Sequence, residues 1–265
     1  MGRFRIARTM TRDPQRQPIW SDRLLADPHA APDKAERLRM LFDLVAPRYD
    51  LANAVISLGL SEYARFRLVR RIRRLCPRPH RVLDLCCGPA TLSKVLARTF
   101  PHANVVGADF SFRMLQTARR RTLPPNHRLA AADAMALPFA NRSFDLVTCA
   151  YGLRNFADLD RGLREIGRVL KPGGRLVALD FQIPRNRLFR PIFTFYFRRV
   201  LPLVGGLLTG SLGSGAYHYL PSSVANWHSR DFLLECLRKA GFHETRCRTV
   251  GPDVMVLLTG AKPPG

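Results

Sequence analysis

The spacing of hydrophobic residues along the chain changes near residue 80. Before this point, apolar residues recur every three or four positions over 35–45 and 63–75, which predicts two amphipathic helices. From residue 81 onward, short apolar runs alternate with stretches of helical spacing. This alternation is typical of an α/β fold with a doubly wound, mostly parallel sheet. The predicted strands are 81–86, 104–109, 127–131, 144–151, 174–181, 242–250 and 254–259, and the predicted helices in the same region are 91–99, 111–121, 159–170 and 229–240.

The same pattern divides the chain into parts. Residues 1–33 contain scattered prolines and charges without periodicity, and we expect them to form a flexible basic extension. Residues 34–80 are expected to form an N-terminal helical cap, and residues 81–260 the main α/β domain. An insertion at 184–226, rich in aromatic residues and glycine, interrupts this domain and is expected to form a helical lid.

Acidic residues accompany the ends of three successive predicted strands. Asp84 lies in the first strand just before a turn of small residues, Asp109 ends the second strand, and Asp133 follows the third. Ligands of an open α/β sheet bind beyond the carboxyl ends of its strands. Asp84 can attract a cationic amine, Asp109 can accept hydrogen bonds from two ribose hydroxyls, and Asp133 can contact an adenine amino group. The pattern favours a nucleoside that carries a positively charged sulfonium amino acid.

Two other interpretations apply to the same turn. A dinucleotide site needs the three glycines of a G-x-G-x-x-G motif, and here Gly88 is followed by Ala90 and Ser93. The negative charge of Asp84 also opposes a pyrophosphate. The remaining alternative is a turn without a ligand, in which Asp84 only caps the next helix.

Composition adds a formal net charge of +23, which comes mainly from arginine. Such a charge attracts nucleic acid, anionic membranes or acidic partners, and a lineage-wide arginine-rich composition explains it equally well. The cysteines show no CxxC spacing, so we expect no metal site and a reducing cytoplasm. No secretory signal is recognised, and glycines together with Pro202 argue against a spanning helix in the uncharged stretch 200–227.

Several motifs resemble those of the ubiquinone/menaquinone biosynthesis C-methyltransferases, a family of class I methyltransferases. Leu-Phe-Asp-Leu-Val-Ala-Pro-Arg-Tyr-Asp at 41–50 resembles the family's entry motif. Gly-Leu-Arg-Asn at 152–155 and Tyr-x-Tyr-Leu at 217–220 are the more specific matches, whereas Lys-Pro-Gly-Gly at 171–174 occurs in many methyltransferases. The resemblance covers about residues 38–260, with further matches at 136–139, 143–145 and 200–202.

The resemblance implies a Rossmann-like, seven-stranded sheet and S-adenosylmethionine as the methyl donor. It also implies methylation of a ring carbon of a lipid-soluble quinol, either demethylmenaquinol or 2-methoxy-6-polyprenyl-1,4-benzoquinol, in menaquinone or ubiquinone biosynthesis. The family's cofactor positions fall on Asp84, Gly88, Pro89, Asp109, Phe110, Met114, Asp133, Ala134 and Ala150.

The chain departs from the family pattern in several places. Pro89 stands inside the usual Gly-Thr-Gly turn and removes a backbone donor, and Ala150 replaces a common serine. Leu-Asp-Phe-Gln at 179–182 replaces Leu-Glu-Phe-Ser, and His218 replaces the arginine of Tyr-Arg-Tyr-Leu. These last two departures lie on the expected substrate side, so a methyltransferase for another small hydrophobic molecule is an alternative.

Methylation at a quinol carbon needs aligned reactants and a means of favouring the phenolate. Arg154 and Asn155 directly follow the fourth strand, where a guanidinium can stabilise phenolate charge or orient a basic water. Asp180 and His218 are candidate proton acceptors.

Plainer roles are open for the same residues. Arg154 can instead cap a helix or pair with Asp158 or Asp160, and His218 can be a packed, hydrogen-bonded side chain. The aromatic residues expected at the substrate site are Tyr49, Tyr217 and Tyr219, of which the last two are more often lid or core residues than catalytic groups.

The stretch 188–208 combines aromatic and aliphatic residues with arginines in and beside it. It is predicted to be an apolar channel or a face contacting an anionic membrane, or alternatively a lid helix packed on the core. A peripheral membrane location and a homo-oligomer are both open. No nucleic-acid partner is expected, because base-flipping and aromatic–basic RNA-binding motifs are not recognised, and an RNA methyltransferase is the more distant alternative.

Overall fold

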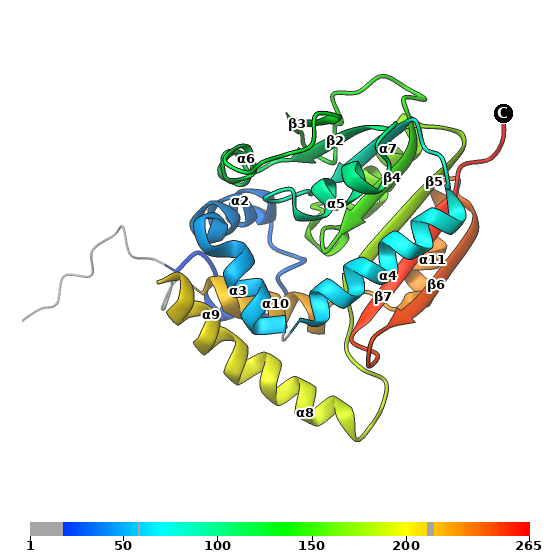
Figure 1. Cartoon of the computed structure of the whole chain (residues 1–265). Helices are drawn as coiled ribbons and strands as arrows, with labels where there is room; N and C mark the ends of the chain where they lie inside the picture. The colour runs from blue at the N-terminus through cyan, green and yellow to red at the C-terminus, as the bar shows by residue number, and fades with distance from the viewer. Residues whose placement is uncertain (1–17, 58, 211–214) are drawn as a thin grey trace, which may run out of the picture.

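The computed structural model describes residues 18–57, 59–210 and 215–265. In these ranges seven strands form one sheet in the order β3-β2-β1-β4-β5-β7-β6 (Figure 1). β1 to β5 are parallel, whereas β7 is antiparallel to both of its neighbours. The strand order reverses between β1 and β4, where sheets of this kind bind ligands. The strands are β1 (Arg81–Leu85), β2 (Asn104–Asp109), β3 (His127–Ala131), β4 (Phe144–Ala150), β5 (Leu170–Phe181), β6 (His243–Val250) and β7 (Met255–Ala261).

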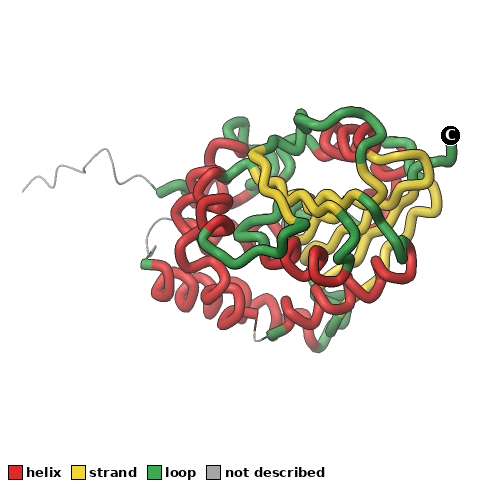
Figure 2. The backbone as a smooth tube through the Cα atoms, turned by 45° about the horizontal axis from the view of Figure 1, so that its top comes forward, coloured by secondary structure: helices red, strands yellow, loops and turns green. Residues whose placement is uncertain are grey.

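Helices cover both faces of the sheet (Figure 2). α4 (Leu60–Leu75) and α5 (Thr91–Thr99) pack on one face, and α7 (Leu159–Val169) and α11 (Arg230–Lys239) pack on the other. Successive side chains of a strand point to opposite faces, so Val82 joins the first cluster and Leu83 the second. The predicted doubly wound α/β fold is confirmed.

The N-terminal cap and the insertion meet at the carboxyl end of the parallel strands, although they lie far apart in the sequence (Figure 1). α3 packs against α9, and the hydroxyl of Tyr196 donates to the carbonyl of Ile56 at 2.5 Å. Together these helices cover the strand ends. The cap supplies α2 (Lys34–Val45), η2 (Ala46–Arg48) and α3 (Tyr49–Ser57), and the insertion supplies α8 (Phe189–Phe195), η4 (Tyr196–Val200), α9 (Leu201–Thr209) and α10 (Ala216–Ala225).

Residues 18–33 differ from the flexible extension predicted over 1–33. Trp20 is 1% exposed, its ring lies 4.6 Å from that of Tyr219, and α1 (Asp22–Ala26) packs against α10. The prediction of a flexible segment relied on its prolines and charges and did not consider Trp20. Burial of this large apolar side chain offsets the conformational entropy lost when the segment becomes ordered. Residues 1–17 lie outside the described residues.

Two of the glycines expected to interrupt the insertion, Gly205 and Gly206, lie inside a helix. Phe189–Thr209 is one continuous helical segment of 21 residues. In its apolar stretch of 18 residues, 33% is buried. By length and composition it could cross a membrane, a property that it shares with core helices of other proteins. The ring of Tyr217 packs against Gly205, where a Cβ would come within 2.3 Å of it. Glycine therefore permits close packing of α9 and α10, and the helix ends only at Gly210, which has a φ of +68°.

Candidate active site

The turn after β1 is shaped to leave its backbone open. Cys86, Gly88 and Ala90 have φ values of +57°, +54° and +63°, and the amide of Gly88 donates to Oδ2 of Asp109 at 2.8 Å. A Cβ built on Gly88 would meet only Cε1 of Tyr49, at 4.0 Å. Space in front of a glycine backbone at the switch point is what a nucleoside ligand needs for close approach.

Asp109 closes β2 beside this turn and is 6% exposed. Its Oδ1 accepts from the amide of Ser111 at 2.9 Å, and burial raises the pKa of the carboxyl to about 6 despite these backbone donors. Each carboxylate oxygen has two lone pairs, so both keep acceptor capacity for ribose hydroxyls. Asp109 is thus placed as the sequence predicts, at the carboxyl end of the parallel strands.

Asp84 is more deeply buried than its predicted role requires. It is 1% exposed, and its two oxygens accept from the hydroxyls of Ser93 at 2.5 Å and Thr148 at 2.7 Å. Burial raises its pKa to about 6. The structure therefore does not present Asp84 for direct contact with a ligand amine.

The other predicted cofactor residues divide into exposed and buried groups. Asp133 is exposed, and its Oδ1 accepts from the amide of Met135 at 2.9 Å. Phe110 is partly buried with its ring edge-on to Phe42, and Met114, on α6 (Phe112–Arg119), is only 1% exposed and packs below it. Pro89 and Ala134 are also buried, and Ala150 is partly buried at the end of β4.

An apolar cavity of about 350 Å³ lies next to this edge. α2, α3, α4, α8, η4 and α10 supply most of its lining residues, and Tyr151, Arg154 and Phe181 close it at the ends of β4 and β5. The ring of Tyr49 both lines the cavity and faces Gly88. The cavity therefore lies directly beside the turn after β1. A hydrophobic molecule in the cavity can therefore meet a ligand held at the strand ends.

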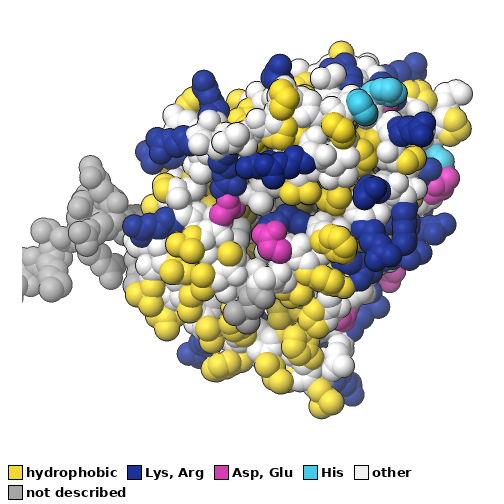
Figure 3. All heavy atoms as spheres, in the orientation of Figure 1, with side chains coloured by type: hydrophobic (Ala, Val, Ile, Leu, Met, Phe, Trp, Pro, Cys, Tyr) yellow, Lys and Arg dark blue, Asp and Glu magenta, His cyan; other side chains and the backbone are white. Residues whose placement is uncertain are grey.

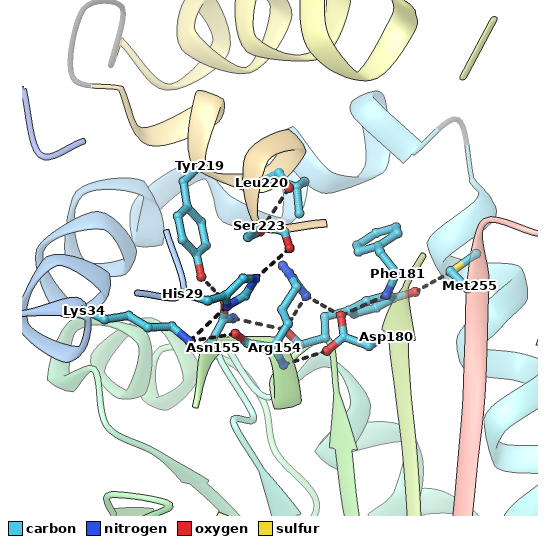
Figure 4. A network of polar contacts seen from close by, with 11 residues as sticks. His29, Lys34, Arg154, Asn155, Asp180, Phe181, Tyr219, Leu220, Ser223 and Met255 are labelled. Carbon is cyan, nitrogen blue, oxygen red and sulfur yellow. Dashed lines mark hydrogen bonds and ion pairs between the residues drawn. The ribbon is translucent and has the colours of Figure 1, made fainter. Parts of the chain in front are cut away.

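Arg154 brings a buried positive charge to the cavity wall (Figure 4). It belongs to η3 (Leu153–Asn155), is 5% exposed, and donates from Nη1 to Oδ1 of Asp180 at 2.6 Å. Its backbone amide donates to Oδ2 of the same carboxylate at 3.1 Å. Burial opposes the charged guanidinium, but Asp180 holds the pKa of Arg154 above its ordinary value. Among the described residues, Nε of Arg154 has no hydrogen-bond partner.

These contacts decide between the interpretations of Arg154. Its ion-pair partner is Asp180, whereas Asp158 caps α7 by accepting from the amide of Arg161 at 2.9 Å. The suggested pairing with Asp158 or Asp160 is therefore wrong. Asp180 is fully buried and engaged by Arg154, so it orients the cation and is poorly placed to accept a proton from a ligand.

The tyrosines of α10 complete the polar part of the wall, and Asn155 lies behind the wall and supports Tyr219. The hydroxyl of Tyr219 donates to Oδ1 of Asn155 at 2.9 Å, and Nδ2 of Asn155 donates to the carbonyl of Tyr151 at 3.2 Å. Tyr217 also lines the cavity, and burial raises its pKa to about 12. His218 lies between these tyrosines but is exposed, because adjacent residues of a helix point in different directions. The structure therefore does not bring His218 to the cavity.

Lys34 and His29 were not predicted from the sequence, although both belong to this network (Figure 4). Lys34 is 5% exposed, and its Nζ donates to the carbonyls of Arg154 at 3.0 Å and Phe156 at 2.6 Å. One signal was available in the sequence. Lys34 shares the buried face of α2 with Leu38, Leu41 and Val45, and a lysine on an apolar helix face needs a buried partner.

Residues 31–262 match the ubiE/COQ5 methyltransferase family. The chain belongs to this family. The predicted family is thereby confirmed, and so is the prediction of a methyltransferase that depends on S-adenosylmethionine.

Two relatives and one solved structure show how far the likeness extends. The demethylmenaquinone methyltransferase of Deinococcus radiodurans is 40% identical over 87% of this chain and 94% of its own length. The ubiquinone/menaquinone biosynthesis C-methyltransferase UbiE of Geobacter sulfurreducens is 39% identical over 87% and 90%. A methyltransferase from Haloferax volcanii, solved in complex with the Trm112 activator, is 20% identical with a TM-score of 0.60 over 84% and 97%, and supports the fold alone.

Proposed function

We propose that this methyltransferase transfers the methyl group of S-adenosylmethionine to a ring carbon of a polyprenyl quinol in menaquinone or ubiquinone biosynthesis. The names of the two relatives point to this substrate class. The single observation that carries the proposal is Arg154, a buried cation in the wall of an otherwise largely apolar cavity beside the strand ends.

The residues at the strand ends fit the cofactor. Asp109 retains acceptor capacity for ribose hydroxyls, the backbone at Gly88 faces open space, and Asp133 is exposed at the next strand end. Phe110 offers an aromatic face next to Asp109. S-adenosylmethionine supplies an electrophilic methyl group on a sulfonium, and these residues would hold it with its charged end near the buried Asp84.

Arg154 can favour the reactive form of a quinol. A ring carbon becomes nucleophilic when a neighbouring hydroxyl loses its proton, and a fixed positive charge in a low-dielectric cavity stabilises the phenolate. Asp180 fixes Nη1, which leaves Nε as a buried donor without a partner among the described residues. Nε itself is enclosed, so a phenolate in the cavity would be stabilised by the charge of the guanidinium at the wall rather than by a bond from this donor.

The apolar part of the cavity suits a prenyl tail. Phe193 and Phe197 stack with ring centroids 4.5 Å apart, and Phe189, Leu201 and Val254 line the same wall. The tail excludes water from the ring end of the cavity, which strengthens the effect of Arg154 on the quinol.

We also propose that the outer face of the insertion contacts an anionic membrane. Phe193, Phe197 and Leu201 are buried, whereas large apolar side chains on the other side of the same helical segment are exposed. The buried face agrees with a lid helix packed on the core, and the exposed face supports the proposed membrane contact. Figure 3 shows hydrophobic side chains gathered where α8 and α9 lie in Figure 1. The exposed residues on this outer side are Leu188, Phe195, Leu203 and Leu207, and the nearby arginines are Arg187, Arg190, Arg198 and Arg199.

The test is a methylation assay on two quinols, a demethylmenaquinol and a 2-methoxy-6-polyprenyl-1,4-benzoquinol, each with and without its prenyl tail. We expect a product heavier by one methyl group from at least one prenylated quinol, and a lower kcat/KM without the tail. Methylation of neither quinol by an enzyme that binds S-adenosylmethionine would overturn the substrate assignment and favour another hydrophobic molecule.

A further inference from the structure

The buried amine of Lys34 joins parts of the chain that surround the cavity. Besides donating to the carbonyls of Arg154 and Phe156, its Nζ lies 3.2 Å from Nδ1 of His29. An ammonium has three donors and no acceptor, so these contacts account for all its hydrogen bonds. Lys34 does not line the cavity, so we give it no direct part in the reaction.

His29 extends the connection to α10. Its Nε2 lies 2.8 Å from the carbonyl of Ser223, which can only accept, so Nε2 carries the proton and Nδ1 accepts from Lys34. This neutral tautomer agrees with the burial of His29, which lowers its pKa to about 4. Through His29, Lys34 is thus linked to the helix that carries Tyr217 and Tyr219.

The two carbonyls held by Lys34 lie on either side of Asn155. Fixing them fixes the backbone from which the side chains of Arg154 and Asn155 extend. Asn155 in turn accepts from Tyr219, whose ring packs on Trp20. The turn, α10 and the N-terminal segment are therefore connected in one hydrogen-bonded and packed unit, shown in part in Figure 4.

We infer that Lys34 is a positioning residue for methyl transfer, which holds the η3 turn so that Arg154 keeps its place at the cavity wall and Asn155 keeps its hydrogen bond with Tyr219. This inference rests on the proposed function. Lys34 would act through the backbone carbonyls that it holds, since it does not line the cavity. A displacement of about 1 Å in such a group is sufficient to slow a reaction a hundredfold, because catalysis depends on alignment.

Lys262 provides a matched control. Its Nζ also donates to two carbonyls, those of Gly167 at 2.6 Å and Leu170 at 2.7 Å, but Leu170 begins β5 at the end of the sheet away from the cavity. Lys34→Met and Lys262→Met therefore remove the same kind of contact, one at the cavity and one far from it. Lys34→Arg keeps the charge and serves as the conservative variant.

The experiment measures kcat, KM and the affinity for S-adenosylmethionine in the full chain, together with hydrogen exchange of the amides at 151–157. We expect Lys34→Met to lower kcat by about tenfold or more at unchanged cofactor affinity, and to speed exchange in this segment. Lys262→Met should change neither, and Lys34→Arg should recover part of the lost kcat. Lys34→Gln replaces Lys34→Met if the latter does not fold.

Equal kcat values in Lys34→Met and Lys262→Met, or unchanged exchange at 151–157, would overturn the inference. Failure of the proposed function is seen separately, as a wild-type enzyme that methylates no quinol. In that case the exchange comparison still decides whether Lys34 holds the turn.

Discussion

At the scale of single residues, the pair formed by Arg154 and Asp180 sets the electrostatics of the cavity. The side chains are 7% and 0% exposed, and the ion-pair distance is 2.6 Å. Such a pair is held at a desolvation cost, which a hydrophobic core would avoid. Its presence at a cavity wall is therefore better explained by chemistry than by stability.

Removing the charge of Asp180 should strongly destabilise the folded protein. Asp180→Asn keeps the shape of the side chain but leaves Arg154 buried without its counter-charge, and loss of one partner of a buried pair costs about 3–5 kcal/mol. We expect a fall of that size in the free energy of unfolding, measured with urea. Glu244→Gln, which breaks the exposed pair with Arg175, should have little effect. Similar small changes in both variants would argue against a structural role for the buried pair.

Cofactor affinity should depend on pH near 6. Burial raises the pKa values of Asp84 and Asp109 to about 6. The ionised carboxylates attract a sulfonium and accept stronger hydrogen bonds, so protons compete with the ligand. Affinity for S-adenosylmethionine should therefore be full at about pH 7.5 and fall as the pH drops through about 6, as measured by calorimetry. Asp109→Asn should weaken binding and flatten this dependence, and a wild-type affinity that is constant from about pH 5 to 8 would contradict the expectation.

At the scale of elements, the close contact between α9 and α10 depends on Gly205. A Cβ at this position would lie 2.3 Å from the ring of Tyr217, which also lines the cavity. The contact joins the apolar helix of the insertion to the helix that carries Tyr219.

Gly205→Ala should therefore be destabilising even though alanine favours helices. Overpacking typically costs about 1–3 kcal/mol, which exceeds the gain of about 1 kcal/mol from replacing a helical glycine. Gly167→Ala in α7 is the control, because its Cβ would meet its nearest atom at an ordinary 3.5 Å. Thermal unfolding should show a lower Tm for Gly205→Ala and an unchanged or higher Tm for Gly167→Ala. A stabilised Gly205→Ala would mean that Tyr217 moves aside freely.

Sequence periodicity predicted the sheet well because each buried strand is a short apolar run with a clear end. The strands at 104–109 and 127–131 agree with the structure, and β5 begins earlier than predicted, at Leu170. The helix in the insertion was harder to predict from the sequence. Glycine weakens an isolated helix, but it allows close packing where a ring such as that of Tyr217 lies against it. Tertiary contact decided that segment.

The residues of the candidate site were also predicted only in part from the sequence. Asp109 and Arg154 could be predicted because one ends a strand and the other closely follows one, and the carboxyl ends of parallel strands lie together. The partner of Arg154 could not, because Asp158 and Asp160 are near in sequence whereas Asp180 is near in space. Lys34 was missed because its partners are backbone carbonyls, which every residue possesses.

At the scale of the whole molecule, a net charge of +23 accompanies an exposed apolar helix face. In the proposed membrane contact, the charge would attract the protein to an anionic surface over a distance set by salt, and the apolar side chains would then hold it there. Both contributions are needed for firm peripheral binding.

Binding to vesicles should separate the two contributions. Phe195→Ser combined with Leu203→Ser should weaken binding to vesicles with anionic lipid by about tenfold or more, because each apolar side chain buried in the lipid contributes about 1.5–3 kcal/mol. Added salt should weaken binding of the wild type as well. Phe232→Ser on α11 removes another exposed aromatic residue as a control. Co-sedimentation that is equal for all three proteins would dismiss this face as the docking surface.

The helix at 189–209 has buried side chains that line the cavity and exposed side chains that face outward. With its outer face in the headgroup region, a quinol would pass from bilayer to cavity and return without dissolving in bulk water. Turnover would then follow the mole fraction of quinol in the lipid. Diluting the same amount of quinol into more lipid would slow the enzyme even at a constant total concentration.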